Sequence, residues 1–377
     1  MNTRDNPAFR MARFVGEAWS PQATFSKKKV FSYVGCAASI NLGDLLLYLA
    51  IRDLFKESYV VPNSPISGVK SMLGRRLLKS AGQVLLKGFS KTDGTLLGGG
   101  TLINDIYFLN VLKDYYRDNI PFYVMGTSVE CSEMLGDNIQ DWAPYLKKAK
   151  VVFLRDQTSH KILEEVGIDA TVIGDPVLSM TIPKVSTGLP KPEGKKKIGI
   201  NVGSTKGDMF GSQDDVNKFF VDLIQKLKAE GNEITIFSMH PKDLANGKDV
   251  ATACGISHEE IWDDYHKAYE FLDFISEQDM IIGQRLHAVI CGTGFGIPSI
   301  SISYRPKCIN YMKSIKAGDY CHKTSDLDLS KVLDQVENIN DNYEQISHSL
   351  ITETNRYRSL QKEAVAKIQA LQSAFKR

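Results

Sequence analysis

Short apolar runs alternate with amphipathic stretches along most of this chain. Such alternation is typical of βαβ units, in which a helix carries the chain from one parallel strand to the next. Helices are expected after Asp44, Asp105 and Asp156. The strands expected in the first half are Val30–Val34, Tyr59–Val61, Thr95–Leu97, Phe122–Met125, Val151–Leu154 and Thr171–Ile173. The pattern therefore predicts an α/β domain built on a parallel sheet.

The alternation is interrupted once, between residues 181 and 197. This segment contains three prolines, two glycines and a run of lysines, a composition typical of a linker between domains. A second series of strands is expected beyond it: Ile198–Val202, Ile234–Ser238, Met280–Gly283 and Ser299–Ser303. From Leu329 the apolar positions recur every three or four residues, which predicts a helical segment to the end that packs against both domains.

These patterns divide the 377 residues into five parts. We expect an N-terminal extension (1–28), a first Rossmann-like domain (29–180), the linker (181–197), a second Rossmann-like domain (198–328) and a C-terminal helical segment (329–377). The chain is long enough for two substantial cores. The predicted fold class is α/β, with two doubly wound domains and a long C-terminal helix.

The overall charge excludes one class of function. The chain has 46 Lys and Arg against 44 Asp and Glu, a net charge of +2, which is far from the basic excess of a dedicated nucleic-acid binder. The six cysteines form no C-x-x-C pair, so we expect neither a zinc site nor a disulfide scaffold, and no metal or cofactor. No apolar stretch approaches the roughly 20 residues that span a bilayer, and no secretory signal is recognisable, so a cytoplasmic protein is expected.

One segment is strongly basic. Between Glu57 and Asp93 there is no acidic residue, whereas residues 69–91 combine lysines and arginines with apolar positions at helical spacing. A core helix with a solvated basic face is the slightly favoured interpretation. The alternative is peripheral contact with an anionic membrane surface, which would suit a lipid-linked substrate at the inner membrane face.

The most informative pattern lies in the second domain. Gly283 ends an expected strand, and Arg285 and His287 fall at the first turn of the helix that follows. After the next strand, Pro306 suits a first helical position and Lys307 follows it directly. A helix N-terminus carries partial positive charge, so a cation there is unfavourable unless an anion shares the site. Each residue alone is more often structural, but the three together predict a bound phosphate or carboxylate.

Other expected strand-to-helix junctions also carry unusual residues. They are candidates because ligands of open α/β sheets bind beyond the carboxyl ends of the strands. Asn41 and Asp44 are suitable helix caps, and the alternative for Asp44 is contact with a substrate hydroxyl. The Gly98–Gly100 turn either lets the backbone approach a ligand closely or is needed only for a tight turn. Neither a phosphate-binding loop nor a G-x-G-x-x-G motif is present.

Arg155 stands at the end of an expected strand in the first domain. It either pairs with the adjacent Asp156 or, if the domains face each other, approaches Arg285, His287 and Lys307 from the opposite wall. Guanidinium groups bind carboxylate or phosphate through paired hydrogen bonds, and a lysine adds a compact charge. A small, multiply charged anion would then bridge the two walls.

Taken together, these motifs resemble the polysaccharide pyruvyltransferase family, from about Val30 to about Ile315. The resemblance rests on Asn41–Asp44, Gly98–Gly100, Phe153–Asp156 with Ser159, Gly174–Pro176, Arg285–Ala288, and Gly296–Pro298 leading to Tyr304 and Lys307. It implies two Rossmann-like domains arranged as in GT-B glycosyltransferases, an acceptor side in the first domain and a donor side in the second. It also implies phosphoenolpyruvate as a substrate and transfer of pyruvate to two hydroxyls of one sugar as a cyclic ketal.

The resemblance also suggests roles for individual residues. Arg155, His287 and Lys307 match the donor site, and Arg285 adjoins them. An imidazole, with an ordinary pKa of roughly 6.5, can hold or release a proton near neutrality, so His287 is the candidate acid. Asp44 is the candidate base that acts on the acceptor hydroxyl. The candidate acceptor contacts are Asn41, Asp44, Gly99, Gly100, Thr127 and His240. Around Thr127 the chain departs from the more glycine-rich turn of the family.

A GT-B glycosyltransferase that uses a nucleotide sugar is the main alternative, since fold alone does not decide function. It would need a group, usually a carboxylate, for the nucleotide ribose. Glu270, Glu277 and Asp279 precede the Arg285 junction without forming such a motif. A non-catalytic saccharide-binding protein is a third interpretation, which would predict apolar residues at the junctions. The cationic residues found there favour a small anion.

Overall fold

The computed structural model describes residues 28–37, 40–62, 92–116, 118–130, 138–204 and 210–375. The expected N-terminal extension, apart from its last residue, and the basic segment 69–91 lie outside the described residues. Contacts divide the chain into two compact units. The first comprises Met1–Ile40, Asp44–Ser179 and Arg358–Arg377, and the second comprises Asn41–Gly43 and Met180–Tyr357.

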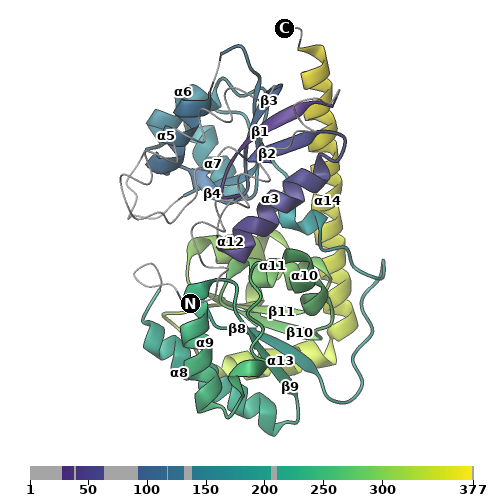
Figure 1. Cartoon of the computed structure of the whole chain (residues 1–377). Coiled ribbons are helices and arrows are strands. Elements are labelled where there is room, and N and C mark those ends of the chain that lie inside the picture. The colour runs from purple at the N-terminus through teal and green to yellow at the C-terminus, as the bar shows by residue number, and fades with distance from the viewer. Residues whose placement is uncertain are drawn as a thin grey trace. The chain divides into compact units, whose positions relative to one another are not determined.

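The first unit is built on a parallel sheet of order β2-β1-β3-β5-β6-β7, with β4 paired to β5 (Figure 1). Its strands are β1 (Val30–Val34), β2 (Tyr59–Pro62), β3 (Gly94–Gly98), β4 (Thr101–Ile103), β5 (Phe122–Val129), β6 (Val152–Leu154) and β7 (Thr171–Val172). Its helices are α5 (Ile106–Tyr115), α6 (Ile139–Leu146), α7 (Gln157–Glu165), the 3₁₀ turn Pro176–Ser179 and α3 (Leu42–Leu54), of which the first two residues belong to the second unit. All residues of β1, β3 and β5 are buried, as expected of strands covered on both faces.

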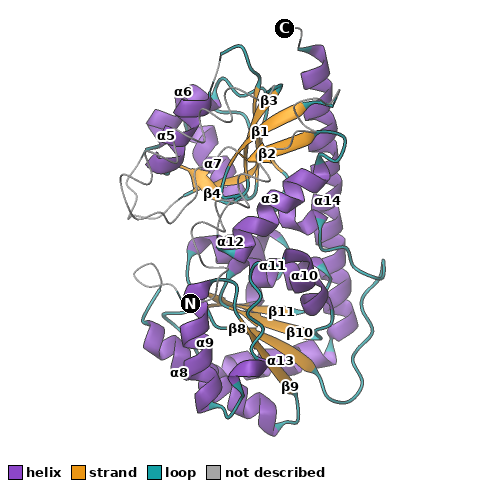
Figure 2. Cartoon of the chain, viewed as in Figure 1, coloured by secondary structure: helices purple, strands orange, loops and turns teal. Residues whose placement is uncertain are grey.

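The second unit repeats this architecture with a parallel sheet of order β12-β11-β10-β8-β9 (Figure 2). Its strands are β8 (Lys197–Asn201), β9 (Glu233–Phe237), β10 (Met280–Gly283), β11 (Ser299–Ser303) and β12 (Cys321–Lys323). Its helices are α8 (Gln213–Ala229), α9 (Pro241–Ala253), α10 (Ala268–Ser276), α11 (Leu286–Gly294), α12 (Pro306–Ser314) and α13 (Leu329–Asp341), with 3₁₀ turns at His258–Glu260 and Gly318–Tyr320. Apolar residues of α8 and α13 pack with those of the central strands in one core.

The long helix α14 (Tyr343–Ala374) contributes to each unit through buried polar side chains as well as apolar ones. In the second unit the Tyr343 hydroxyl donates to the carbonyl of Asp279 at 2.8 Å. In the first unit Gln361 Nε2 donates to the Asp175 carbonyl at 2.8 Å, and Gln372 Nε2 donates to the Asp93 carbonyl at 2.7 Å. The described part of the chain contains no helix with an apolar stretch that could cross a membrane.

The predicted elements are confirmed with small changes at their ends. Asp105 and Asp156 cap α5 and α7, accepting hydrogen bonds from the backbone N–H groups of Tyr107 and Ser159. The helix expected after Asp44 begins earlier, at Leu42, because the Asn41 side chain accepts the Gly43 N–H at 3.0 Å. The three-residue strands β4 and β12 were not predicted.

Candidate active site

Each sheet has one point at which the strand order reverses, between β1 and β3 in the first unit and between β8 and β10 in the second. Loops that follow the two strands diverge there, and ligands of doubly wound sheets bind beside such points. In the second unit the reversal lies between β8 and β10, whose last residues, Asn201 and Gly283, pair with each other. The Arg285 junction predicted from the sequence therefore stands at the expected place.

Arg285 occupies the N-cap position of α11 and is held there by both its backbone and its side chain. Its backbone N–H donates to Asn201 Oδ1 at 2.8 Å. The guanidinium meets the fully buried Asp243 of α9 with Nε at 3.1 and 3.2 Å and Nη2 at 2.5 Å, and Nη2 also donates to the Ser204 carbonyl at 2.8 Å. The Arg285 side chain is only 15% exposed, so Asp243 compensates most of its charge.

The electrostatics of Arg285 follow from this pairing. Burial by itself lowers the pKa of the guanidinium, but the charge and hydrogen bonds of Asp243 more than reverse this effect, so the pKa is raised. The nearby Tyr304 hydroxyl raises it further. Arg285 is therefore a permanent, internally paired cation whose first role is to join α9 to the β10–α11 junction.

His287 is the second residue of α11 and is partly buried. Its imidazole lies against the backbone of Gly43, the second residue of α3. Leu42 and Gly43, the first two residues of α3, belong to the second unit, and the Leu42 N–H donates to the Met239 carbonyl of that unit at 2.9 Å. The histidine ring is thus placed between the start of its own helix and the start of α3.

Lys307 is the second residue of α12, directly after Pro306 at the first position, as predicted. Its ammonium lies 5.4 Å from the centroid of the Tyr304 ring. Among the residues that the structure describes, no carboxylate lies within ion-pair distance of Lys307. Because β10 and β11 are paired neighbours, α11 and α12 begin at the same sheet edge. Tyr304 borders both Lys307 and Arg285, so it brings the two predicted junctions together.

Arg155 follows β6 in the first unit and is 5% exposed. Its Nη1 lies 3.4 Å from the fully buried Asp175 carboxylate, its Nε 4.0 Å from Asp156, and its Nη2 donates to Thr101 Oγ1 at 3.0 Å. The pairing with Asp156 considered from the sequence is therefore present, and Asp175 adds a second carboxylate. A direct contact between Arg155 and a donor substrate stays a prediction.

The candidate acceptor residues of the first unit lie around the β1 and β3 ends. Asp44 is partly exposed in the first turn of α3, where a carboxylate is favoured by the helix dipole. It lies near Tyr33: burial is the main cause of the raised pKa of that hydroxyl, and the charge of Asp44 adds to it. Gly99 and Gly100 have φ of 70° and 79°, and Thr127 is fully buried with its hydroxyl donating to the Gly100 carbonyl at 3.2 Å.

These contacts give several candidates a structural role. The Gly99–Gly100 turn needs the left-handed backbone that glycine adopts readily, and Thr127 holds that turn. Asn41 caps α3, and His240 in the second unit caps α9 by accepting the Lys242 N–H on Nδ1 at 2.9 Å. Their contact with an acceptor stays a prediction.

Comparison with known proteins decides the family. A model of the polysaccharide pyruvyl transferase family matches residues 41–306, more than half of the chain. The chain belongs to the polysaccharide pyruvyl transferase family. The match begins at Asn41 and ends at Pro306, so it includes both the α3 turn and the Arg285 junction. No curated protein matches the chain in sequence.

Solved structures show the fold of this family member. UDP-N-acetylglucosamine 2-epimerase from Rickettsia bellii is 15% identical, with a TM-score of 0.59 over 92% of this chain and 97% of that chain. The S. aureus MnaA–UDP structure is 12% identical, with a TM-score of 0.56 over 91% and 96%. The Neisseria meningitidis UDP-GlcNAc 2-epimerase bound to UDP-GlcNAc is 10% identical, with a TM-score of 0.52 over 90% and 100%. At these identities the likeness shows the fold alone, which is GT-B-like.

For several residues of this candidate site, nothing in the sequence indicated the contact that they make. Asp243 and Asn201 hold Arg285, although neither adjoins it in the chain. Asp175 belongs to a motif that supported the resemblance, but its role as the partner of Arg155 could not be read from that motif. Gly43 likewise lay inside the Asn41–Asp44 motif without an assigned role.

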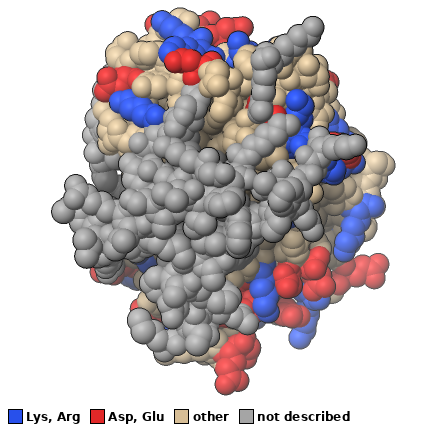
Figure 3. Space-filling model, turned by 45° about the horizontal axis from the view of Figure 1, so that its top comes forward, with Lys and Arg blue, Asp and Glu red and all other residues tan. Residues whose placement is uncertain are grey.

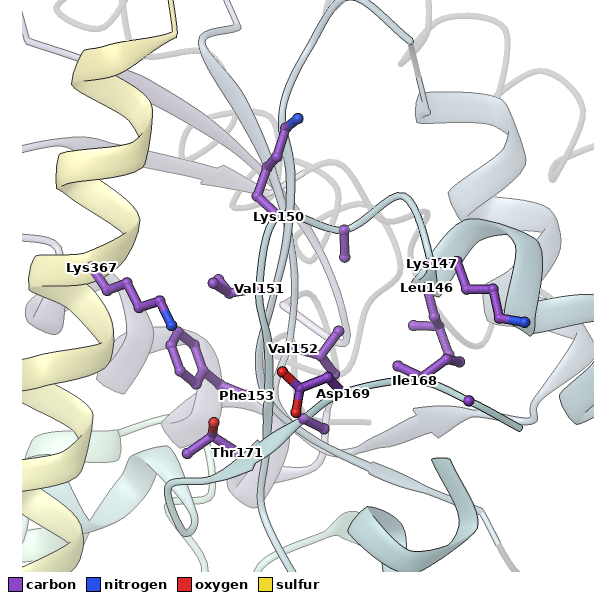
Figure 4. A pocket seen from close by; sticks show the side chains of 13 residues that line it. Leu146, Lys147, Lys150, Val151, Val152, Phe153, Ile168, Asp169, Thr171 and Lys367 are labelled. Atoms are coloured by element: carbon purple, nitrogen blue, oxygen red, sulfur yellow. The ribbon is translucent and has the colours of Figure 1, made fainter. Parts of the chain in front are cut away.

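A surface hollow in the first unit lies away from this edge. It encloses about 270 Å³ and precedes β6 and β7, whereas ligands bind beyond the opposite, carboxyl ends of such strands (Figure 4). Lys147, Lys150 and Lys367 line it with Asp169, and the Lys367 ammonium lies 6.0 Å from the centroid of the Phe153 ring. Where residues are described, the face in Figure 3 shows acidic and basic groups interspersed, which suits the small net charge.

Proposed function

We propose that the protein transfers the pyruvyl group of phosphoenolpyruvate to two hydroxyls of one sugar, as a cyclic ketal, in a cell-surface polysaccharide or its lipid-linked precursor. Membership of the family supports transfer of a pyruvyl group. The observation that carries the choice of donor is Lys307, a cation without a carboxylate partner among the described residues, at a helix start beside the Arg285–His287 junction.

The donor is a compact anion with a phosphate and a carboxylate. Helices α11 and α12 begin at one sheet edge, so their free N–H groups and partial positive charge favour an anion there. Lys307 supplies the charge that this anion would balance. Arg285 contributes a fixed guanidinium that Asp243 keeps in place, and Arg155 is the corresponding fixed cation of the first unit.

In the first step, His287 donates a proton to the methylene carbon of phosphoenolpyruvate. The central carbon becomes electrophilic, and a sugar hydroxyl forms a C–O bond to it while its proton passes to a base. Asp44, in the first turn of α3, is the proposed base. The product of this step is a tetrahedral carbon that carries methyl, carboxylate, sugar oxygen and phosphate.

In the second step, the bond between that carbon and the phosphate oxygen breaks, and phosphate leaves with the electron pair. The neighbouring sugar hydroxyl attacks the same carbon and loses its proton, which closes the ketal ring. Lys307 stabilises the charge that develops on the leaving phosphate. The net reaction converts phosphoenolpyruvate and a diol into a pyruvate ketal and inorganic phosphate.

The direct test is incubation of the protein with phosphoenolpyruvate and a panel of lipid-linked or synthetic glycosides. We expect the mass increase of a ketal and an equal amount of released phosphate. His287→Gln keeps a polar side chain of similar size that does not act as an acid near neutral pH. It is expected to lower the rate of transfer by at least about 100-fold. Turnover at the wild-type rate in this variant would exclude His287 as the acid.

A nucleotide-sugar-dependent glycosyltransferase is the second candidate, because the structures of similar fold include complexes with UDP and with UDP-GlcNAc. The same acceptor panel with sugar nucleotides separates the two. Glycosyl transfer from a sugar nucleotide, without ketal formation from phosphoenolpyruvate, would replace the proposed function by this one.

A further inference from the structure

The first turn of α3 has no room for a side chain at Gly43. A Cβ atom at this position would lie 2.7 Å from Cγ of His287 and 3.1 Å from its Cβ, and closer still to its Nδ1. A carbon atom in van der Waals contact needs about 3.5–4.0 Å. The clash involves the base of the histidine side chain as well as its ring, so a small movement of the ring edge would not relieve it.

The backbone itself does not require glycine here. Gly43 lies inside α3 and is not among the glycines with positive φ. In a helix alanine is the better residue, because glycine loses more conformational freedom on folding. The absence of a side chain at position 43 is therefore explained by the imidazole next to it.

Both partners of this contact are fixed. Leu42 donates its N–H to the Met239 carbonyl at 2.9 Å, and the Asn41 side chain accepts the Gly43 N–H at 3.0 Å, so the turn is held at the residue before the glycine and at the glycine N–H itself. On the other side, Arg285 is bound to Asn201 and Asp243 two residues before His287. With both backbones held, an added methyl group forces the His287 ring out of its present orientation.

We propose that Gly43 is a positioning residue, whose bare Cα sets the orientation of the His287 imidazole against the start of α3. The inference rests on the proposed function only in giving His287 the role of proton donor. Proton transfer to carbon demands a well-aligned donor, and a displacement near 1 Å can cost about 100-fold in rate. The three atoms nearest to the added methyl group all belong to His287 and none to Lys307, so the main effect is expected on kcat and a smaller one on KM for phosphoenolpyruvate.

The experiment compares Gly43→Ala with Gly247→Ala in the full-length protein. Gly247 is the matched control because it also lies inside a helix of the second unit, α9, and a Cβ there would meet its nearest atoms at 3.6 Å, an ordinary contact. We expect Gly43→Ala to lower kcat by roughly 100-fold while KM for phosphoenolpyruvate changes less than about threefold. Gly247→Ala is expected to leave both unchanged. The His287 ring resonances should move only in Gly43→Ala.

A thermal double-mutant cycle with His287→Ala tests the contact without any activity. Gly43→Ala should lower Tm by at least about 3 °C in the wild-type background, because the site is overpacked, and should leave Tm equal or higher once the imidazole is removed. Additive Tm changes, or an unchanged kcat in Gly43→Ala, would overturn the proposal. If His287→Gln keeps full activity, the proposed acid fails, while the Tm cycle still reports separately on the contact.

Discussion

The two arginine junctions and the lysine junction look alike in the sequence and differ in the structure. Arg155 and Arg285 are mostly buried, and each meets a fully buried carboxylate, Asp175 or Asp243. Lys307 is half-buried, and its described contact is the ring of Tyr304. A buried guanidinium needs a carboxylate to offset its desolvation, whereas a partly exposed ammonium does not. The sequence therefore gives the position of a cation at a strand-to-helix turn. It does not show whether a carboxylate of the protein already pairs with that cation or whether the charge is available to a substrate.

The difference assigns separate tasks to the three side chains. The planar guanidinium binds several acceptors in fixed directions, which suits the joining of neighbouring loops. Arg285 links α9, the Ser204 loop and α11 in this way. The lysine has a compact charge on a flexible stem, which suits an incoming phosphate. We expect the arginines to be needed mainly for stability and Lys307 mainly for donor binding.

The largest effect is expected for Arg285→Met. The substitution leaves Asp243 buried without its cation, which should lower the free energy of unfolding by about 3–5 kcal/mol, measured by urea denaturation. Arg285→Met combined with Asp243→Asn should recover part of this loss, because the buried charge is removed while the side chain still accepts the Ser204 N–H. An unchanged unfolding free energy in the single variant would show that the pair is not the main support of the junction.

Arg155→Met should also lower the free energy of unfolding, but by a smaller amount, about 3 kcal/mol. Its ion-pair distances are longer than those of Arg285, and Asp156 and Asp175 keep hydrogen bonds from the Ser159 and Val177 N–H groups. Thr101→Val, which removes one hydrogen bond to Arg155, is the graded control, with an expected loss of about 1 kcal/mol. If Arg155→Met keeps its stability and instead raises KM for phosphoenolpyruvate, Arg155 belongs with Lys307 and the comparison fails.

Lys307→Met should have the smallest effect on folding, within about 0.5 kcal/mol, because no described carboxylate loses a partner. Its effect should appear in catalysis: loss of one charge contact should raise KM for phosphoenolpyruvate about tenfold, or about 1.4 kcal/mol. Steady-state kinetics and urea denaturation on the same preparation measure both quantities. A large loss of stability with an unchanged KM would make Lys307 a structural residue instead.

Local features of this chain were readable from the sequence because their physical causes are local. Strands such as β1 and β10 are buried throughout, so they appear as runs of mostly apolar residues. Asp105 and Asp156 cap the helices that they precede, and Pro306 opens α12, since these preferences depend only on neighbouring backbone groups. The family could be recognised for a similar reason, because its motifs lie at these same junctions.

What each junction residue contacts was decided by the tertiary structure alone. Asp243 meets Arg285 because α9 and α11 begin near the same point of the sheet, and no spacing along the chain encodes that approach. The lack of a side chain at Gly43 has meaning only beside the His287 ring, which comes from a distant part of the chain. The sequence by itself determined which residues stand at the sheet edges. The fold decided which of their charges are already compensated, because burial and charge pairing are properties of packed surfaces.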